Sequence, residues 1–257
     1  MIKVEKIETW GFEHAIRGMR NPKNSWDKSD SEWKIYMPEY PNLSEAKYIV
    51  GPNDLGLMRR LYSAGPEHRK YLRQIFVSMD ITAPLYWWKE FDTYKIGTTA
   101  DSCSTMHKIH AKEFERTDFS CEHLPKGSDA WSDTWELSTS KNMVLINRDD
   151  SLYLSACDLL DLVIRGLNHF RKKYLDTKDK DMWWQMIQLL PSSYNQKRTV
   201  TFTYENVVSM IRQRSGHKLD EWREFVEILK DLPYVREIIA DETNNVCRVE
   251  EASKTES

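Results

Sequence analysis

Several features that assign a chain to a specialised class are missing from this sequence of 257 residues. No apolar run approaches the roughly 18 residues of a membrane-spanning helix, and the start, MIKVEKIETW, lacks the pattern of a signal peptide. The four cysteines are scattered and make no disulfide framework, and a net charge of -3 does not favour a general nucleic-acid binder. We therefore expect a cytoplasmic protein that works without a membrane and without nucleic acid.

Aromatic residues, by contrast, are abundant: the chain has 10 Trp and 12 Tyr. Aromatics in that number usually build cores and subunit interfaces, so we expect a homo-oligomer. The length suffices for one large domain with a sizeable core. We predict a single domain over residues 1–240, followed by a disordered tail over residues 241–257, which is acidic and polar.

Hydrophobic periodicity predicts both strands and helices. Apolar and polar residues alternate in three expected strands, at residues 2–10, 74–82 and 198–204. Spacings of three and four residues, with capping residues or breakers at the ends, predict helices at residues 55–63, 83–94, 151–174, 182–190, 205–214 and 220–231, and a short one from Pro66. We expect Asp54 to cap the first of these helices. Residues 20–45 predict a long loop pinned by its aromatics, and residues 142–147 fit either a strand or the start of a helix.

One stretch, residues 83–107, combines an aromatic helix with a polar segment that follows Gly97. The segment holds small hydroxyls, one carboxylate and one thiol: Thr98, Thr99, Asp101, Ser102, Cys103, Ser104 and Thr105. Such residues are poor core material, because hydroxyls offer little apolar area and need hydrogen-bond partners when buried. The segment is therefore either a cradle for an anion such as a phosphate or a solvated connection.

Two blocks of this sequence resemble the flavin-dependent thymidylate synthases. The family pattern RHRxxSxNExSxRY lies over residues 93–106 without a gap, where Lys95, Thr98, Asp101 and Cys103 are chemically similar replacements. In the second block the family shows LP, a Thr-rich strand, a helix ending in LR, and AQWEI. The counterparts here are Leu190-Pro191, Thr201, Arg214 and Glu221-Trp222. Together the blocks cover roughly half of the chain.

The resemblance implies a fold, an activity and partners. The fold is α/β, with a central mixed, mostly antiparallel sheet flanked by helices, and the family assembles as a tetramer. The activity is C5 methylation of a uracil nucleotide, with reduced FAD as hydride donor and methylenetetrahydrofolate as carbon donor. The catalytic position is Arg214, whose guanidinium would stabilise charge on the pyrimidine ring. The implied substrate-binding residues are Glu90, Asp101, Ser102, Cys103, Ser104 and Thr105, and the cofactor-binding residues are Gln74, Tyr94, Lys95, Thr98 and Thr203. No metal is implied.

The departures from the pattern favour a second hypothesis. Basic, imidazole and amide positions of the family signature are occupied by Thr93, Tyr94, Ala100 and Thr105, and further ones by Ile187, Thr203 and Glu205. A non-catalytic descendant that binds a nucleotide or a protein partner would tolerate these losses. If the activity is kept, either the substrate differs from deoxyuridine monophosphate or other basic residues compensate, with Lys108, Arg198 and Arg212 as candidates.

Three other interpretations concern two single residues and one cluster. Arg214 near a helix end could simply satisfy backbone carbonyls and the helix dipole. Cys103 could be a nucleophile, although the sequence fixes no partner base. A zinc site could use the cysteines and histidines that lie between residues 103 and 123, namely Cys103, His107, His110, Cys121 and His123, although their spacing matches no compact zinc motif.

Overall fold

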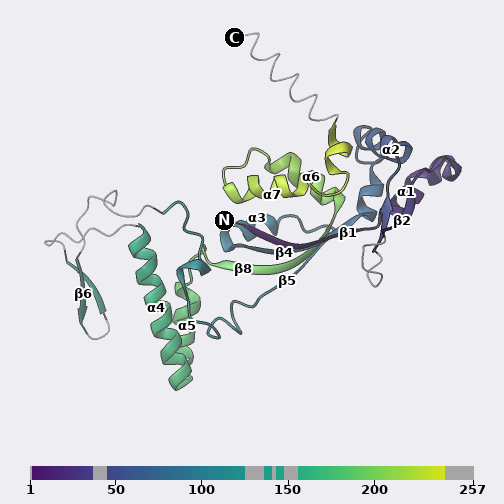
Figure 1. Cartoon of the computed structure of the whole chain (residues 1–257). Helices are drawn as coiled ribbons and strands as arrows, with labels where there is room; N and C mark the ends of the chain where they lie inside the picture. Colours follow the sequence, from purple (N-terminus) through teal and green to yellow (C-terminus); the bar gives the residue numbers. More distant parts are fainter. Residues whose placement is uncertain (1, 37–44, 125–135, 141–142, 148–155, 241–257) are drawn as a thin grey trace, which may run out of the picture. The chain divides into compact units, whose positions relative to one another are not determined.

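A computed structural model describes residues 2–36, 45–124, 136–140, 143–147 and 156–240 of the chain. They form two compact units, each considered by itself (Figure 1). The sheet unit comprises residues 2–81, 91–101 and the chain from residue 198 onward, and the helix-pair unit comprises residues 82–90 and 102–197. The predicted tail at 241–257 and the predicted helix start at Ser151 lie outside the described residues.

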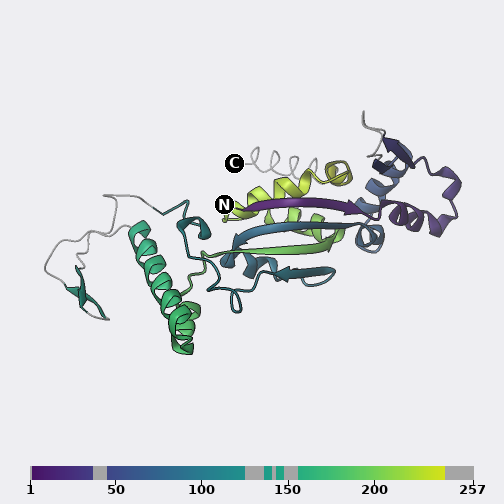
Figure 2. The same cartoon turned by 60° about the horizontal axis from the view of Figure 1, so that its bottom comes forward.

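The sheet has four antiparallel strands in the order β1-β4-β8-β5, which confirms the predicted fold class. Its strands are β1 (Lys3–Trp10), β4 (Phe76–Pro84), β8 (Asn195–Thr203) and β5 (Thr98–Ser102). Figure 2 shows the four strands side by side. The three strands expected from alternation are confirmed as β1, β4 and β8. β5 is a correction, because its residues were expected to form a loop; two β-branched threonines at its start suit an edge strand.

Helices complete the sheet unit. They are α1 (Phe12–Arg20), α2 (Pro52–Ser63), α6 (Tyr204–Arg214) and α7 (Asp220–Lys230), and short 3₁₀ turns lie at Asn21–Lys23, Trp26–Lys28 and Lys70–Gln74. The last of these turns stands where a helix from Pro66 was expected. Figures 1 and 2 show α6 and α7 on one face of the sheet. Phe91, Phe202 and Trp222 meet there among fully buried rings, with Phe91 and Phe202 centroids 6.1 Å apart. Many of the abundant aromatics are thus core residues.

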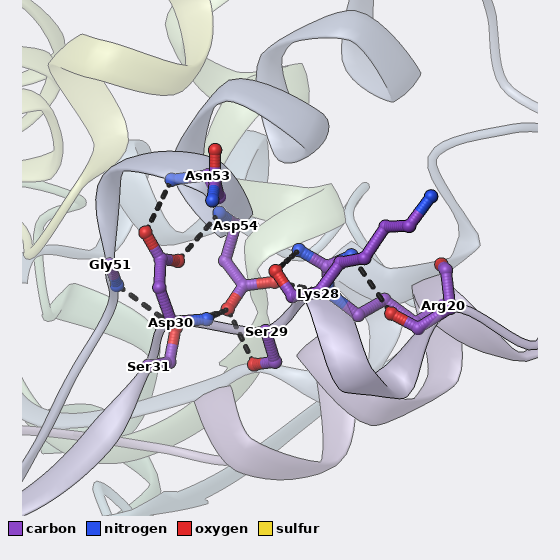
Figure 3. Close-up of polar contacts among 9 residues, drawn as sticks. Arg20, Lys28, Ser29, Asp30, Ser31, Gly51, Asn53 and Asp54 are labelled. Carbon is purple, nitrogen blue, oxygen red and sulfur yellow. Dashed lines mark hydrogen bonds and ion pairs between the residues drawn. The ribbon is translucent and has the colours of Figure 1, made fainter.

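Residues 20–45 differ most from expectation. A strand, β2 (Glu32–Tyr36), pairs antiparallel with β3 (Glu45–Ile49), so that Trp33 lies opposite Tyr48. The segment before this hairpin is pinned chiefly by a buried ion pair, in which Arg20 Nε donates to Asp54 Oδ1 at 2.6 Å (Figure 3). The predicted capping role of Asp54 is wrong. Helix α2 begins after Gly51. The N–H groups of Asn53 and Asp54, in its first turn, donate to the carboxylate of Asp30, a residue from another segment.

The helix-pair unit is built on two packed helices, α4 (Ala156–Thr177) and α5 (Lys180–Leu189), joined at Lys178 and Asp179. Asp179 caps α5 by accepting the N–H of Asp181 at 2.9 Å. The core of the unit is apolar and includes Ile109, Phe114, Phe119, Leu160, Leu167 and Met186. The other elements are α3 (Leu85–Phe91), which crosses the boundary by one residue, a 3₁₀ turn at Arg116–Asp118, and a hairpin of β6 (Glu136–Ser140) and β7 (Met143–Asn147). No helix within the described ranges is both long and apolar enough to cross a membrane.

Candidate functional site

Strand β8 runs directly into helix α6, and this junction carries buried polar side chains. Thr203 donates its hydroxyl proton to Oδ1 of Asn206 at 2.8 Å. Asn206 donates from Nδ2 to the carbonyl of Ile96 and to Oγ1 of Thr98, both at 2.9 Å. Because a carbonyl only accepts, the amide nitrogen must face Ile96, which fixes the direction of every bond in the network. The network ties the start of β5 to the start of α6 within the sheet unit.

Gly97 allows the backbone before β5 to approach Thr203 and Asn206 closely. Its φ of +72° lies in the left-handed region, which residues other than glycine rarely adopt. A Cβ at this position would lie 3.3 Å from Cγ2 of Thr203 and 3.5 Å from Oδ1 of Asn206. The predicted cofactor residues Thr98 and Thr203 are therefore brought together, with Asn206 between them.

Helix α6 ends at Arg214, whose guanidinium lies against two aromatic rings. Its Nε donates to the hydroxyl of Tyr94 at 3.0 Å, and its Cζ lies 5.0 Å from the ring centroid of Trp222 and 5.7 Å from that of Tyr94. Tyr94 passes its own hydroxyl proton to Oε1 of Gln213 at 2.9 Å. A charge-assisted hydrogen bond and a cation–π contact with the buried Trp222 both restrict the guanidinium. Arg214 is thus a half-buried cation with its side chain held in place, beside another predicted site residue.

The other basic residues near the signature differ in whether their charge is available to bind an anion. Lys95 and Arg212 are exposed. Arg198, expected as a possible substitute for a lost arginine, is mostly buried and donates from Nη1 to Asp92 at 2.7 Å. Because Asp92 already balances its charge, Arg198 is a weak candidate for binding an anion.

The polar segment after Gly97 divides at the boundary between the units. Asp101 is exposed on β5 in the sheet unit. In the helix-pair unit, Cys103 continues the strand pairing, since its N–H donates to the carbonyl of Lys197 at 2.9 Å and its carbonyl accepts from Gln196 Nε2 at 2.8 Å. Ser104 accepts the N–H groups of Met106 and His107 on its hydroxyl and so closes a turn. Ser102 is exposed and Thr105 is half-buried.

Two predicted site residues lie on other elements. Glu90 is half-buried in α3 of the helix-pair unit. Gln74 ends the 3₁₀ turn before β4, and its side-chain oxygen would lie 2.6 Å from a Cβ added to Gly18 of α1. Gln74 therefore packs on α1.

The alternative chemistries of the cysteines gain no support. Cys103 is exposed, and no described side chain makes a hydrogen bond to its sulfur. Among the residues that the structure describes, no three His, Cys, Asp or Glu side chains are grouped so that they could hold a metal ion. The histidine and cysteine positions between 103 and 123 thus form no zinc site there.

Asn206 is the central residue of the junction between β8 and α6, and the sequence interpretation missed it. A signal was present, because an asparagine at position 206 falls four residues before Met210 and next to Val207 and Val208, on the apolar side of an amphipathic helix. A buried amide there must hydrogen-bond to other buried groups. Besides Thr203, its partners are Ile96 and Thr98, which lie over a hundred positions earlier, and no helical pattern indicates them.

Comparisons with known proteins give a clear structural result. No known family matches the sequence, and no curated protein matches it in sequence. Thymidylate synthase X (ThyX) from Helicobacter pylori, solved with FAD and dUMP, is similar over 94% of this chain and 98% of its own, with a TM-score of 0.59 and 16% identity. This chain has the ThyX fold. A UMP/dUMP methylase from Streptomyces cacaoi, solved with 5-Br dUMP, covers 94% of this chain and 95% of its own, with a TM-score of 0.56 and 12% identity.

Proposed function

We propose that this ThyX-like protein methylates C5 of a uracil nucleotide with the help of a flavin. The observation that supports the proposal most is the immobilised guanidinium of Arg214 at the end of α6, in a chain whose fold matches ThyX from Helicobacter pylori along almost its whole length. That neighbour was solved with FAD and dUMP. A uracil nucleotide, methylenetetrahydrofolate and a homo-oligomeric state belong to the same proposal.

Arg214 would act on the electron distribution of the pyrimidine. Methylation at C5 requires negative charge to develop on the ring and its carbonyl oxygens, and a guanidinium stays protonated while it stabilises that charge. Tyr94 and Trp222 would act as positioning residues, because they restrain the guanidinium before substrate binds. Removal of one such preorganised donor costs about 3 kcal/mol of activation free energy in comparable sites.

The residues of the Asn206 network fit a flavin nucleotide in their chemistry. Thr98 accepts a hydrogen bond from Asn206, so its own hydroxyl proton stays available for a phosphate or ribityl oxygen. Lys95 adds an exposed ammonium three residues earlier. The proton of Thr203 is already donated to Asn206, which gives Thr203 a supporting role instead of a contact with the cofactor. When bound, a reduced flavin supplies the hydride that this chemistry needs.

The test is a direct assay of the purified protein with FAD, a reductant, methylenetetrahydrofolate and dUMP labelled with tritium at C5. We expect tritium release to the solvent, together with flavin absorbance that remains with the protein after gel filtration. The variant Arg214→Ala should lower tritium release by at least a hundredfold while flavin retention is unchanged. If the wild-type protein releases no tritium from dUMP or from UMP, the proposed activity is wrong.

A non-catalytic module remains the second candidate, and one observation favours it. Arg198 is neutralised by Asp92, so this possible replacement for a lost signature arginine is engaged elsewhere. For this candidate we expect a colourless protein that retains no added FAD but binds a uridine nucleotide or a protein partner. Calorimetric titration with dUMP and with FAD separates the two candidates, since the enzyme binds both ligands.

A further inference from the structure

A cavity of about 930 Å³ lies in the sheet unit, among elements that neither the Asn206 network nor Arg214 touches. It is bordered by the end of β1, the start of α1, the β2–β3 hairpin and the residues Pro233 and Tyr234. Its size is at the upper end of the range for small-molecule sites. The turn from β1 into α1 is held by Gly11, whose φ is +96° and where a Cβ would lie 2.1 Å from the carbonyl oxygen of Gln74. This part of the cavity wall therefore requires glycine at position 11.

Aromatic side chains line this cavity, and each is fixed by its own neighbours. Trp10 stacks on Phe76 with ring centroids 5.8 Å apart, and Phe12 meets Tyr234 edge-on at 5.4 Å. Trp33 lies edge-on to Tyr48 at 5.4 Å. Nevertheless Trp10 is 44% exposed and Trp33 is 57% exposed. Large rings that are held in place but left open to solvent beside a cavity are typical of a binding site.

The charges of the cavity indicate which ligand it suits. Among the described residues that line it, Glu8 and Glu13 carry carboxylates, Lys47 carries the one ammonium or guanidinium group, and His14 carries an imidazole. Glu13 also fixes one of the aromatic walls, because it accepts the indole N–H of Trp33 at 3.3 Å. Two carboxylates against one ammonium disfavour a phosphate or another anion. Aromatic faces next to carboxylates favour a cation, since the negative face of each ring and the carboxylate attract the same charge.

We propose that this cavity binds an organic cation, an ammonium or guanidinium group carried on an apolar or aromatic body. The volume exceeds what a small ammonium ion alone would fill, so an apolar body is needed to contact the rings of Trp10 and Trp33. The site is distinct from the proposed nucleotide chemistry, because uracil nucleotides are anions. The inference consequently stands or falls independently of the proposed function.

The experiment uses benzyltrimethylammonium as the probe, benzyl alcohol as the neutral analogue and benzenesulfonate as the anionic one, each titrated into the full chain and followed by tryptophan fluorescence and calorimetry. We expect saturable binding of the cation alone. Trp33→Ala should weaken it by about three- to thirtyfold, the range of one cation–π contact. Trp26→Ala, a control at an exposed tryptophan that does not line the cavity, should leave binding unchanged.

A second variant covers the case in which Trp33→Ala disturbs the hairpin. Glu13→Gln keeps an oxygen that can accept the N–H of Trp33 but removes the negative charge, so it changes the charge of the cavity and little else. We expect it to weaken the cation by about threefold or more and to leave benzyl alcohol unaffected. Equal binding of the three probes, or binding of the cation that neither variant weakens, would overturn the proposal.

Discussion

Asp54 offers the sharpest test of how the sheet unit is held together. Its carboxylate is completely buried and accepts four hydrogen bonds, from Arg20 Nε at 2.6 Å, Ser31 Oγ at 2.6 Å, Ser29 Oγ at 2.7 Å and the N–H of Asp30 at 3.2 Å (Figure 3). Arg20 is also buried, and its other nitrogens donate to the carbonyls of Ser25 and Lys28. The substitution Asp54→Ala removes the acceptor and leaves a buried guanidinium without its counter-ion.

The expected loss of unfolding free energy is about 3–5 kcal/mol. Each hydrogen bond to a charged group contributes roughly 1.5–3 kcal/mol, but bonds to a single carboxylate are not additive. Breaking one side of a buried ion pair costs about 3–5 kcal/mol, because the remaining charge stays desolvated. The cost of breaking the buried ion pair decides the estimate, since Arg20 has only 5% of its surface exposed and cannot reach water without moving α1.

Urea unfolding at pH 7, followed by the fluorescence of the buried tryptophans, measures this loss. Asp27→Ala is the matched control, because Asp27 is an exposed aspartate of the same segment, and it should change the unfolding free energy by no more than about 0.5 kcal/mol. The double variant Arg20→Met with Asp54→Leu removes both charges together. It should be clearly more stable than Asp54→Ala, since no unpaired charge is left in the core.

Two results would refute this reasoning. A loss below about 1 kcal/mol for Asp54→Ala would mean that Arg20 finds water or another acceptor at little cost. A double variant no more stable than the single one would mean that the network stabilises the unit through its shape instead of its charge balance.

Four further predictions follow from individual contacts. Burial alone would raise the pKa of Asp54, but the hydrogen bonds from Ser31, Ser29 and Arg20 outweigh it and hold that pKa below its usual value. The stability that Asp54 contributes should therefore be present above about pH 4 and decline as the pH falls below that. A pH series of urea titrations should show this decline in the wild type but not in Asp54→Asn. Gly97→Ala should cost about 1–2 kcal/mol in the same assay because of its left-handed φ, whereas the matched Gly216→Ala, where a Cβ meets open space, should not destabilise; equal effects would exclude strain at Gly97. Tyr94→Phe should slow tritium release about tenfold or more without loss of FAD, since Arg214 loses a charge-assisted hydrogen bond, and an unchanged rate would remove Tyr94 from its positioning role. Asp179→Ala should lower the unfolding free energy by about 1 kcal/mol through the lost cap of α5, and no change would show that this cap is dispensable.

Local patterns predicted much of the secondary structure correctly. Alternation located β1, β4 and β8, and helical spacing located α2, α6 and α7 within a few residues of their observed ends. For β4, β8 and the three helices the prediction succeeds because part of each element is buried, so that the period of the apolar residues reports the geometry directly. The β2–β3 hairpin was missed, because Trp33 and Ile35 stay exposed and the strand has no buried face to reveal it.

The candidate site was predictable only in its parts. The sequence register named four residues that the structure brings together in two places. Arg214 donates a hydrogen bond to Tyr94, and Thr98 and Thr203 both hydrogen-bond to Asn206. The link from Thr203 to Thr98 was not predictable, because it depends on the contact of Asn206 with Thr98, which lies more than a hundred positions earlier. The wrong assignment of Asp54 has the same cause: the cap of α2 comes from Asp30, and the true partner of Asp54 is Arg20.

The sequence by itself determined the positions of the main strands and helices, and it predicted a polar segment whose chemistry suits an anionic ligand. These properties depend on composition and on short-range spacing, whereas the fold class was implied by the resemblance to a known family. Only the tertiary structure decided which polar groups face each other, that Arg214 is held by Tyr94 and Trp222, and that an acidic, aromatic cavity lies beside β1. The reason is physical. A buried polar group must find a partner wherever the packed chain brings one, and that distance in space has no counterpart in the spacing of the sequence.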